Sequence, residues 1–332
     1  MGAFIKDIEY YLPDKVVTNE DLEKEFPDWS ATKIEEKIGI KQRHVTIEGQ
    51  TALDLAFEAS SKVLKKFDKN SIDFVLLCTQ SPDYYLPSSA CILQDRLGLK
   101  TSAGAFDYNL GCSGYIYGLA MAKSFINTGI ATNVLLVMAE TYSKHIHHKD
   151  VGNRTIFGDG AAATIISKST SENIFEFDLG TDGKGMGDLI IRNGGLKNRF
   201  NPDEQDYNDE NGILRNNNKL FMNGPDIFNF TISNVPVLIT NVLKKNSLAF
   251  EEVDYFVFHQ ANKYMLDYLK KKIKIPDNKF YQDMSNTGNT VSATIPIALK
   301  DCLNKKLIKT NDKIILAGFG VGLSWGGCLI TI

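Results

Sequence analysis

The chain has 332 residues, a formal net charge of −3 and an apolar content that is ordinary for a globular protein. Its length allows two domains or one large fused unit, and its mild acidity excludes the basic surface that binds nucleic acid. The first fifteen residues lack the apolar core of a signal peptide, and no apolar run is long enough to span a bilayer, so we expect no membrane partner. Five cysteines without close pairing are typical of reduced thiols, which indicates a cytoplasmic protein.

The order of the predicted elements indicates an internal repeat. Residues 72–80 and 253–261 each begin with an apolar residue and an aspartate, continue as an apolar run and end in a polar turn. Such runs are typical of strands buried on both faces of a helix-covered sheet. A strand, a helix and a strand follow in both copies, at 105–108, 113–127 and 133–139 and again at 279–282, 292–303 and 313–318. We therefore expect two similar α/β halves, residues 1–170 and 171–332.

One segment interrupts this alternation. Residues 193–218 are rich in Asn, Asp and Gly and contain few apolar anchors. This composition predicts a long loop or flap, and the sequence leaves open whether the segment links the halves or covers a site.

Cys112 stands between a predicted strand and a predicted helix, and Gly111 and Gly114 on either side of it permit a sharp turn. Free N–H groups and the positive end of the helix dipole favour a thiolate at this position, which predicts a nucleophile. The alternative is a small core cysteine, which is the commoner fate of this residue type and the interpretation given to the other four.

Two polar residues follow predicted elements in the second half. His259 ends an apolar strand, where a parallel sheet presents functional groups, although a core histidine remains an alternative. Asn289 lies in a glycine turn before a helix, where a plain N-cap is the alternative. His145, His147 and His148 form a second cluster, but no carboxylate or cysteine pattern supports a metal site there. We expect that cluster to be a solvated helix end.

Glycine density rises again in residues 318–327, which suits an oxyanion hole built from main-chain N–H groups. Together these segments resemble the β-ketoacyl-acyl-carrier-protein synthase III family of thiolase-fold enzymes. The resemblance runs nearly end to end and rests on an ordered set of short motifs: Gly39-Ile40 with Arg43, residues 86–91, 111–114, 157–161, 259–262 and 288–290, and residues 320–322 with Trp325.

The resemblance implies an α/β fold with five αβαβα layers and two similar halves, of which the first carries Cys112 and the second His259 and Asn289. It also implies a homodimer that uses acyl-CoA and acyl-carrier-protein thioesters as substrates in fatty acid biosynthesis. Cys112 would take the acyl group, with the oxyanion held by the backbone N–H groups of Cys112 and Val321. Malonyl-carrier protein would then lose CO₂, and His259 and Asn289 would hold the enolate during Claisen condensation. Neither a metal nor a bound cofactor is implied.

The same resemblance assigns substrate contacts to Leu86, Arg154, Asn262 and Lys33. Two of these depart from the family pattern, because Lys33 aligns with a tryptophan that stacks on the CoA adenine and Leu86 aligns with a phenylalanine that gates the acyl pocket. These departures concern the choice of substrate. An alternative function keeps Cys112 but passes the acyl group to an oxygen or nitrogen acceptor; the joint presence of His259 and Asn289 favours condensation.

Overall fold

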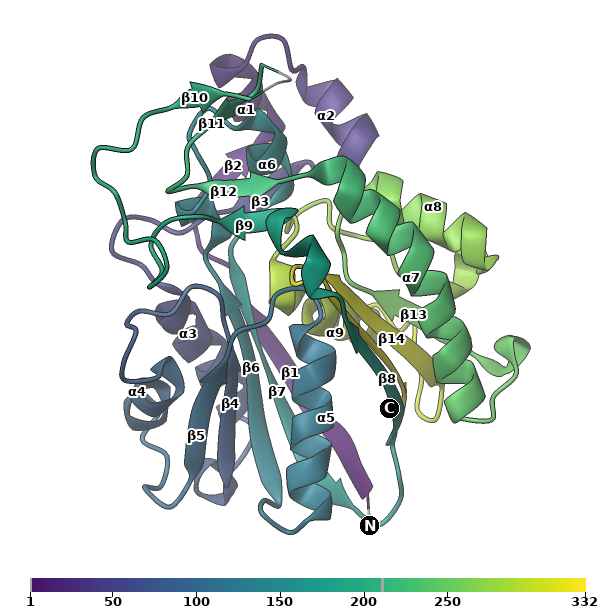
Figure 1. Ribbon diagram of the computed structural model, residues 1–332. Helices are drawn as coiled ribbons and strands as arrows, with labels where there is room; N and C mark the ends of the chain where they lie inside the picture. Colours follow the sequence, from purple (N-terminus) through teal and green to yellow (C-terminus); the bar gives the residue numbers. More distant parts are fainter. Residues whose placement is uncertain (1, 210–211) are drawn as a thin grey trace.

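The computed structural model describes residues 2–209 and 212–332, and it contains two mixed β-sheets (Figure 1). The first sheet has the order β1-β7-β6-β4-β5. Its strands are β1 (Gly2–Tyr11), β7 (Gly160–Ser169), β6 (Asn133–Glu140), β4 (Phe74–Cys78) and β5 (Gly104–Tyr108). The second sheet has the order β13-β14-β15-β8. Its strands are β13 (Tyr255–Phe258), β14 (Lys313–Gly320), β15 (Ser324–Thr331) and β8 (Ile174–Thr181).

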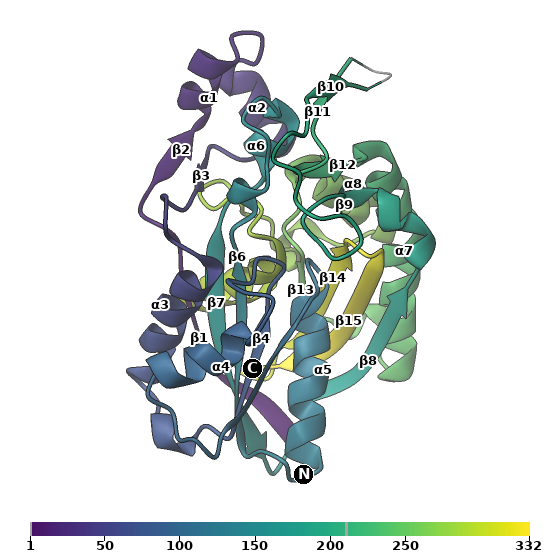
Figure 2. The same ribbon diagram turned by 60° about the vertical axis from the view of Figure 1, so that its left-hand side comes forward.

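Helices cover both sheets and also fill the space between them. Helices α5 (Gly114–Asn127) and α9 (Thr294–Asn304) contact strands of both sheets, and Figure 2 shows α5 between the sheets. Helix α3 (Ala52–Leu64) packs on the outer face of the first sheet beside α4 (Ser89–Arg96), and α7 (Gly224–Lys245) packs on the second sheet beside α8 (Lys263–Ile273). The resulting layers are αβαβα, so the predicted thiolase-like architecture is confirmed.

Shorter elements gather at one end of the sheets, at the top of Figure 1. They comprise helices α1 (Asn19–Glu25), α2 (Ala31–Ile38) and α6 (Val151–Ile156) and the paired strands β2 (Val16–Thr18) with β3 (Gln42–His44), β9 (Leu189–Ile191) with β12 (Leu220–Met222), and β10 (Tyr207–Asn208) with β11 (Leu214–Arg215). This is also the end at which β4, β6 and β13 finish, so loops from both sheets converge there.

The two sheets repeat one arrangement. β4 pairs in parallel with β6, and β13 pairs in parallel with β14. Because these paired strands are covered on both faces, they read in sequence as continuous apolar runs. β4, β6 and α5 correspond to β13, β14 and α9, as the repeat predicts. The division at residues 1–170 and 171–332 stays a prediction.

The predicted strand at residues 279–282 is wrong. Residues 277–279 form a 3₁₀ turn, and only one parallel bridge, between Phe280 and Phe256, joins this segment to the sheet. The side chain of Gln260 takes the place of a strand neighbour, since its Nε2 donates to the carbonyl of Tyr281 (3.3 Å) and its Oε1 accepts from the amide of Asp283 (3.1 Å). Because Gln260 satisfies the carbonyl of Tyr281 and the amide of Asp283, these backbone groups do not need hydrogen bonds from a neighbouring strand.

Of the predicted loop at residues 193–218, residues 210 and 211 lie outside the described part of the chain; the described residues are mostly loop, as expected, but they include the paired strands β10 and β11. The prediction of a solvated histidine cluster is wrong for His147, which is buried and has Nε2 3.3 Å from Asp206 Oδ1. A long-range contact between a turn and an insert cannot be inferred from local spacing, and this one fixes the insert against the turn after β6.

Candidate active site

Cys112 occupies the turn between β5 and α5, and glycines permit its close approach to the neighbouring backbone. A side chain at Gly114 would collide with the sulfur of Cys78. On the opposite side, a Cβ atom at Gly318 would lie 2.6 Å from the carbonyl oxygen of Cys112, and one at Gly320 would lie 2.9 Å from its sulfur. The glycines of β14 therefore let a strand of the second sheet pass directly beside a residue of the first.

The thiol of Cys112 is buried, and its environment opposes ionisation. Burial and the charge of Glu140 raise the pKa of Cys112 to about 12, although the backbone N–H groups of Cys112 and Val321 act in the opposite direction. The expectation of a resting thiolate is therefore wrong for this state, because loss of solvation outweighs the helix N-terminus. The backbone N–H groups of Cys112 and Val321 favour the thiolate, and their role as an oxyanion hole stays a prediction.

His259 follows β13, and the residue is 2% exposed. Burial lowers the pKa of His259 to about 3, so its imidazole is neutral across the physiological range. Nδ1 lies 2.7 Å from the hydroxyl of Thr294, and that hydroxyl lies 3.0 Å from the carbonyl oxygen of Val291. Sequence reasoning missed Thr294, whose only local signal is a hydroxyl at the first residue of a helix.

A hydroxyl has one hydrogen and can satisfy either tautomer of the ring. When Thr294 donates to Val291, its oxygen accepts from Nδ1–H of His259, and Nε2 is left as an acceptor. When Thr294 donates to Nδ1, the proton of the ring is on Nε2, which is then a donor. Thr294 thus allows Nε2 of His259 to act either as a hydrogen-bond acceptor or as a donor.

Asn289 is oriented by its neighbour in the chain. Its Oδ1 accepts from the amide of Val291 at 2.9 Å, which leaves the Nδ2 hydrogens as donors for the cavity. Val291 has a φ of 57°, a conformation that costs energy for a β-branched residue. A strained residue that fixes an amide side chain is typical of a functional site.

The backbone of Asn289 is joined to the first half of the chain. Its amide donates to the carbonyl of Ile156 (2.9 Å), and its carbonyl accepts from the amide of Gly158 (3.0 Å), which makes a parallel bridge beside Phe157. Gly158 has no space for a side chain, because a Cβ atom there would collide with the carbonyl of Thr287. Asn289 is therefore positioned by residues of the other half.

Cys112, His259 and Asn289 line one cavity of about 160 Å³. Most of the remaining lining is apolar, including Phe157 and Phe319. The structure thus brings together the three residues that the sequence singled out as catalytic, from three separate loops. A mostly apolar cavity with a few convergent polar groups is the usual form of a small-molecule site.

The four predicted substrate contacts fall in different places. Asn262 lines the cavity, and its Oδ1 caps α8 by accepting from the amide of Met265 (2.9 Å). Leu86 is 83% exposed on the loop before α4, and Lys33 is exposed on α2. Arg154 lies outside this cavity and pairs with Glu25 (2.6 Å). The substrate roles of these residues stay predictions.

Glu140, at the end of β6, is a buried carboxyl group that the sequence analysis did not identify. It accepts hydrogen bonds from the amide of Gln80 and from the hydroxyls of Ser81 and Ser292. Burial raises the pKa of Glu140 to about 8. An acidic residue at the end of an apolar strand was the available signal, but its partners lie up to 152 residues away in the chain.

Within residues 2–209 and 212–332, no cluster of three or more His, Cys, Asp or Glu side chains could hold a metal ion. No helix in the same residues has the length and apolar character needed to cross a bilayer.

The chain resembles known synthases along almost its whole length. Family profiles described as 3-oxoacyl-[acyl-carrier-protein] synthase III and as the C-terminal part of that synthase match residues 106–183 and 243–332. A β-ketoacyl-[acyl-carrier-protein] synthase III of Clostridium perfringens is 39% identical over 97% of both chains. A crystal structure of a 3-oxoacyl-(acyl-carrier-protein) synthase III has a TM-score of 0.98 and 44% identity and covers all of both chains. A crystal structure of a 3-oxoacyl-(acyl-carrier protein) synthase from Burkholderia xenovorans LB400 has a TM-score of 0.93 and 34% identity, covering 100% of this chain and 94% of that one.

The fold and these comparisons define a thiolase-fold enzyme of the acyl-transferring, condensing type. Within that class, the chain belongs to the β-ketoacyl-[acyl-carrier-protein] synthase III family.

Proposed function

We propose that the protein performs a decarboxylative Claisen condensation between an acyl-CoA and malonyl-acyl-carrier protein, through an acyl group on Cys112. The observation that carries the proposal is the meeting of Cys112, His259 and Asn289 in one apolar cavity. A thiol alone suffices for acyl transfer, whereas a neutral imidazole and an amide donor together suit an enolate.

Loading begins with the protonated thiol of Cys112. Nε2 of neutral His259 accepts the thiol proton while sulfur attacks the thioester carbonyl. The backbone N–H groups of Cys112 and Val321 donate to the resulting oxyanion. The carbon–sulfur bond to CoA then breaks, and the departing CoA thiolate takes the proton from His259. The products are free CoA and acyl-Cys112.

Condensation uses the same cavity with the opposite tautomer of His259. The bond between the malonyl carboxylate and its methylene carbon breaks, CO₂ leaves, and the electron pair forms an enolate. Nε2–H of His259 and Nδ2–H of Asn289 donate to the enolate oxygen. The methylene carbon attacks the acyl-Cys112 carbonyl, the bond to sulfur breaks, and a 3-oxoacyl-carrier protein forms. The Cys112 thiolate that is released takes a proton from water, which restores the thiol. The hydroxyl of Thr294, within bonding distance of Nδ1, supports this exchange of roles.

The test is a two-stage assay. Acyl-CoAs of graded chain length are incubated with the protein, and the mass added to Cys112 is read by intact-protein mass spectrometry. Malonyl-acyl-carrier protein is then added, and CO₂ and the 3-oxoacyl product are measured. Protein alkylated at Cys112 is the control. Loading followed by CO₂ release supports the proposal; loading that ends in transfer to an oxygen or nitrogen acceptor without CO₂ release contradicts it and establishes acyl transfer instead.

The protein is further proposed to act as a homodimer in the cytoplasm, without a bound cofactor. Tyr84, Tyr85 and Leu86 are consecutive side chains that are 61%, 72% and 83% exposed, and the neighbouring β5 forms one end of its sheet. Exposed apolar groups beside a sheet edge favour association. Sedimentation velocity should give a dimer, and Leu86→Glu should weaken it, whereas Tyr264→Glu on α8 should not. A monomeric wild-type protein would contradict this assembly.

A further inference from the structure

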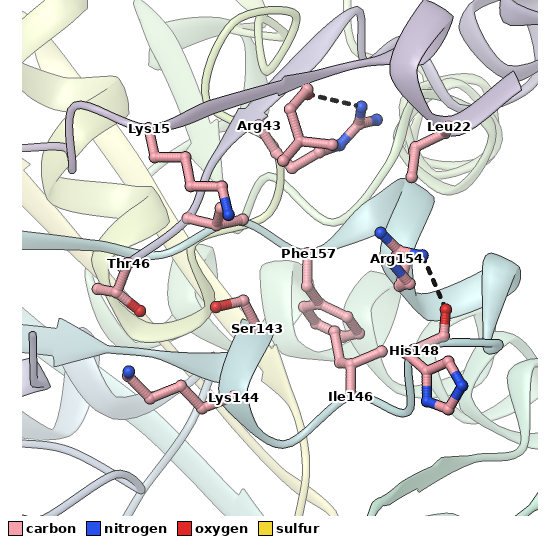
Figure 3. A pocket seen from close by; sticks show the side chains of 12 residues that line it. Lys15, Leu22, Arg43, Thr46, Ser143, Lys144, Ile146, His148, Arg154 and Phe157 are labelled. Atoms are coloured by element: carbon pink, nitrogen blue, oxygen red, sulfur yellow. Dashed lines mark hydrogen bonds between the residues drawn. The ribbon is translucent and has the colours of Figure 1, made fainter. Parts of the chain in front are cut away.

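A second cavity, of about 300 Å³, lies beside the catalytic cavity and shares Phe157 with it. Its walls come from β2, β3, α1, α6 and the turn after β6 (Figure 3). Of its lining residues, only Arg154 is among the substrate contacts predicted above, and none of the reaction steps proposed above takes place in this space. Its volume is at the lower end of the range for small-molecule sites.

The charged side chains that line this second cavity are all basic: Lys15, Arg43, Lys144 and Arg154. Glu25 compensates only Arg154, through two contacts of 2.6 and 3.0 Å. Lys15 and Lys144 have no ion pair among residues 2–209 and 212–332. On a chain with a net charge of −3, this concentration of cations points to a specific role.

Asp159 is a buried carboxylate that makes no ion pair with the cavity's cations among residues 2–209 and 212–332. Asp159 is behind the wall and accepts four hydrogen bonds, from the amide and hydroxyl of Thr46 and from the amide and hydroxyl of Ser143. Both residues line the cavity, and Figure 3 shows the two hydroxyls near each other at its left side. Asp159 is therefore engaged in fixing this wall.

Arg43 lines the same cavity and has no counter-ion among the described residues. Its side chain is almost fully buried, with 1% exposure, and no carboxylate among the described residues pairs with it. Its terminal nitrogens donate to the carbonyls of Val17 and Thr155 and to Oδ1 of Asn19. Its Nε has no hydrogen-bond partner within the part of the chain that the structure describes. A buried guanidinium with an unused donor and no counter-ion is costly, and an anion in the adjoining cavity would offset that cost.

We infer that this second cavity binds a small organic anion, a carboxylate or phosphate monoester on a short apolar body, at a site separate from the catalytic cavity. Lys15 and Lys144 contact the anionic group from the mouth, and the buried guanidinium of Arg43 adds its field from the wall. The apolar body packs against Val17, Ile146 and Phe157.

The test uses three aromatic probes of similar size: phenyl phosphate, benzoate and the neutral benzyl alcohol. Binding to the full-length protein is measured by calorimetry and by saturation-transfer NMR. We expect saturable binding of at least one anionic probe, and the comparison of phenyl phosphate with benzoate identifies the preferred anion. Lys15→Gln/Lys144→Gln should weaken that binding about tenfold, because it removes both lysines that lack an ion pair.

The matched control is Lys65→Gln/Lys168→Gln, which makes the same change in net charge at two exposed lysines far from the cavity lining. This control should retain wild-type affinity. Val45→Phe should abolish binding by filling the cavity, without altering any charge. Arg43 is left unchanged, since its removal would leave buried acceptors unpaired.

Four results would overturn the inference. These are the absence of binding by both anions, equal binding of benzyl alcohol, equal affinity in the Lys15/Lys144 variant and the wild type, and competitive displacement of the probe by CoA. The last result would make the cavity part of the donor site.

Discussion

Helices α5 and α9 occupy the same central layer, but their first turns support the site by different means. Before α5, close backbone contacts hold Cys112, and main-chain N–H groups of Cys112 and Val321 reach its sulfur. Before α9, side chains provide the support: Oδ1 of Asn289 accepts from a backbone amide, and the hydroxyl of Thr294 meets His259. Apart from His259, which accepts the thiol proton, the side chains around Cys112 should therefore matter little for acyl loading, whereas single side-chain substitutions before α9 should slow condensation.

The largest loss of activity is expected from substitution of the nucleophile, Cys112. Cys112→Ser should reduce acyl loading by at least about 10³-fold, because a serine hydroxyl is far harder to ionise in this buried position. Intact-mass spectra after incubation with acyl-CoA measure the loading directly. Normal acylation of the variant would remove Cys112 from the mechanism, and Cys78→Ser is the matched control for a neighbouring buried thiol.

His259→Ala and Asn289→Ala should separate the two steps. Asn289→Ala should retain loading but lower condensation by about 10²–10³-fold, since a donor to the enolate is lost. His259→Ala should lower condensation similarly and should also slow loading, because the neutral ring accepts the thiol proton. Single-turnover loading followed by chase with malonyl-carrier protein distinguishes the two. Normal condensation by both variants would contradict the proposed roles.

Thr294→Val keeps the shape of the side chain but removes the hydroxyl that faces Nδ1 of His259. An unpaired ring nitrogen in a buried site should lower the condensation rate about tenfold, in kcat and not in KM. Thr294→Ser should restore the rate, because it restores the hydroxyl. If Thr294→Val and Thr294→Ser behave alike, Thr294 has only a packing role.

Glu140→Gln tests whether the charge of Glu140 raises the pKa of Cys112. Above pH 8 the carboxyl of Glu140 is ionised and opposes the thiolate, so its removal should lower the pKa of Cys112 by roughly one unit. The rate of alkylation by iodoacetamide against pH reports that value. The variant should also gain stability relative to the wild type as pH rises from the unfolded-state pKa of Glu140 toward 8, because the raised pKa destabilises the folded protein there. Unchanged profiles would exclude electrostatic coupling between Glu140 and Cys112.

The smallest effect is expected at Val321, which is proposed to contribute a backbone donor. Val321→Ala should leave kcat/KM for loading within about twofold of the wild type, because the N–H group is retained. Steady-state kinetics with a single acyl-CoA suffices. A loss of more than about tenfold would show that the side chain of Val321 is required. It would contradict the conclusion that backbone groups support the site before α5.

The sequence predicted the strands and helices around Cys112 and His259 because buried parallel strands leave continuous apolar runs. It failed at residues 279–282, where the side chain of Gln260 replaces a neighbouring strand. Thr294 and Glu140 were missed because their partners are distant in the chain. The ionisation of Cys112 was misjudged because burial, which local sequence does not reveal, outweighs the position beside a helix N-terminus.

The backbone bridge between Phe157 and Asn289 joins segments that leave the ribosome at different times, so the site cannot be complete until the later segment has been made. A ribosome releases Cys112 long before Asn289 and Val321, and domains fold in order as they emerge. A nascent chain that has completed only its first sheet therefore presents a thiol without its second main-chain donor, without His259 and without Asn289. Such a chain can neither load an acyl group efficiently nor condense it, so the reactive centre is assembled last, when the second sheet docks.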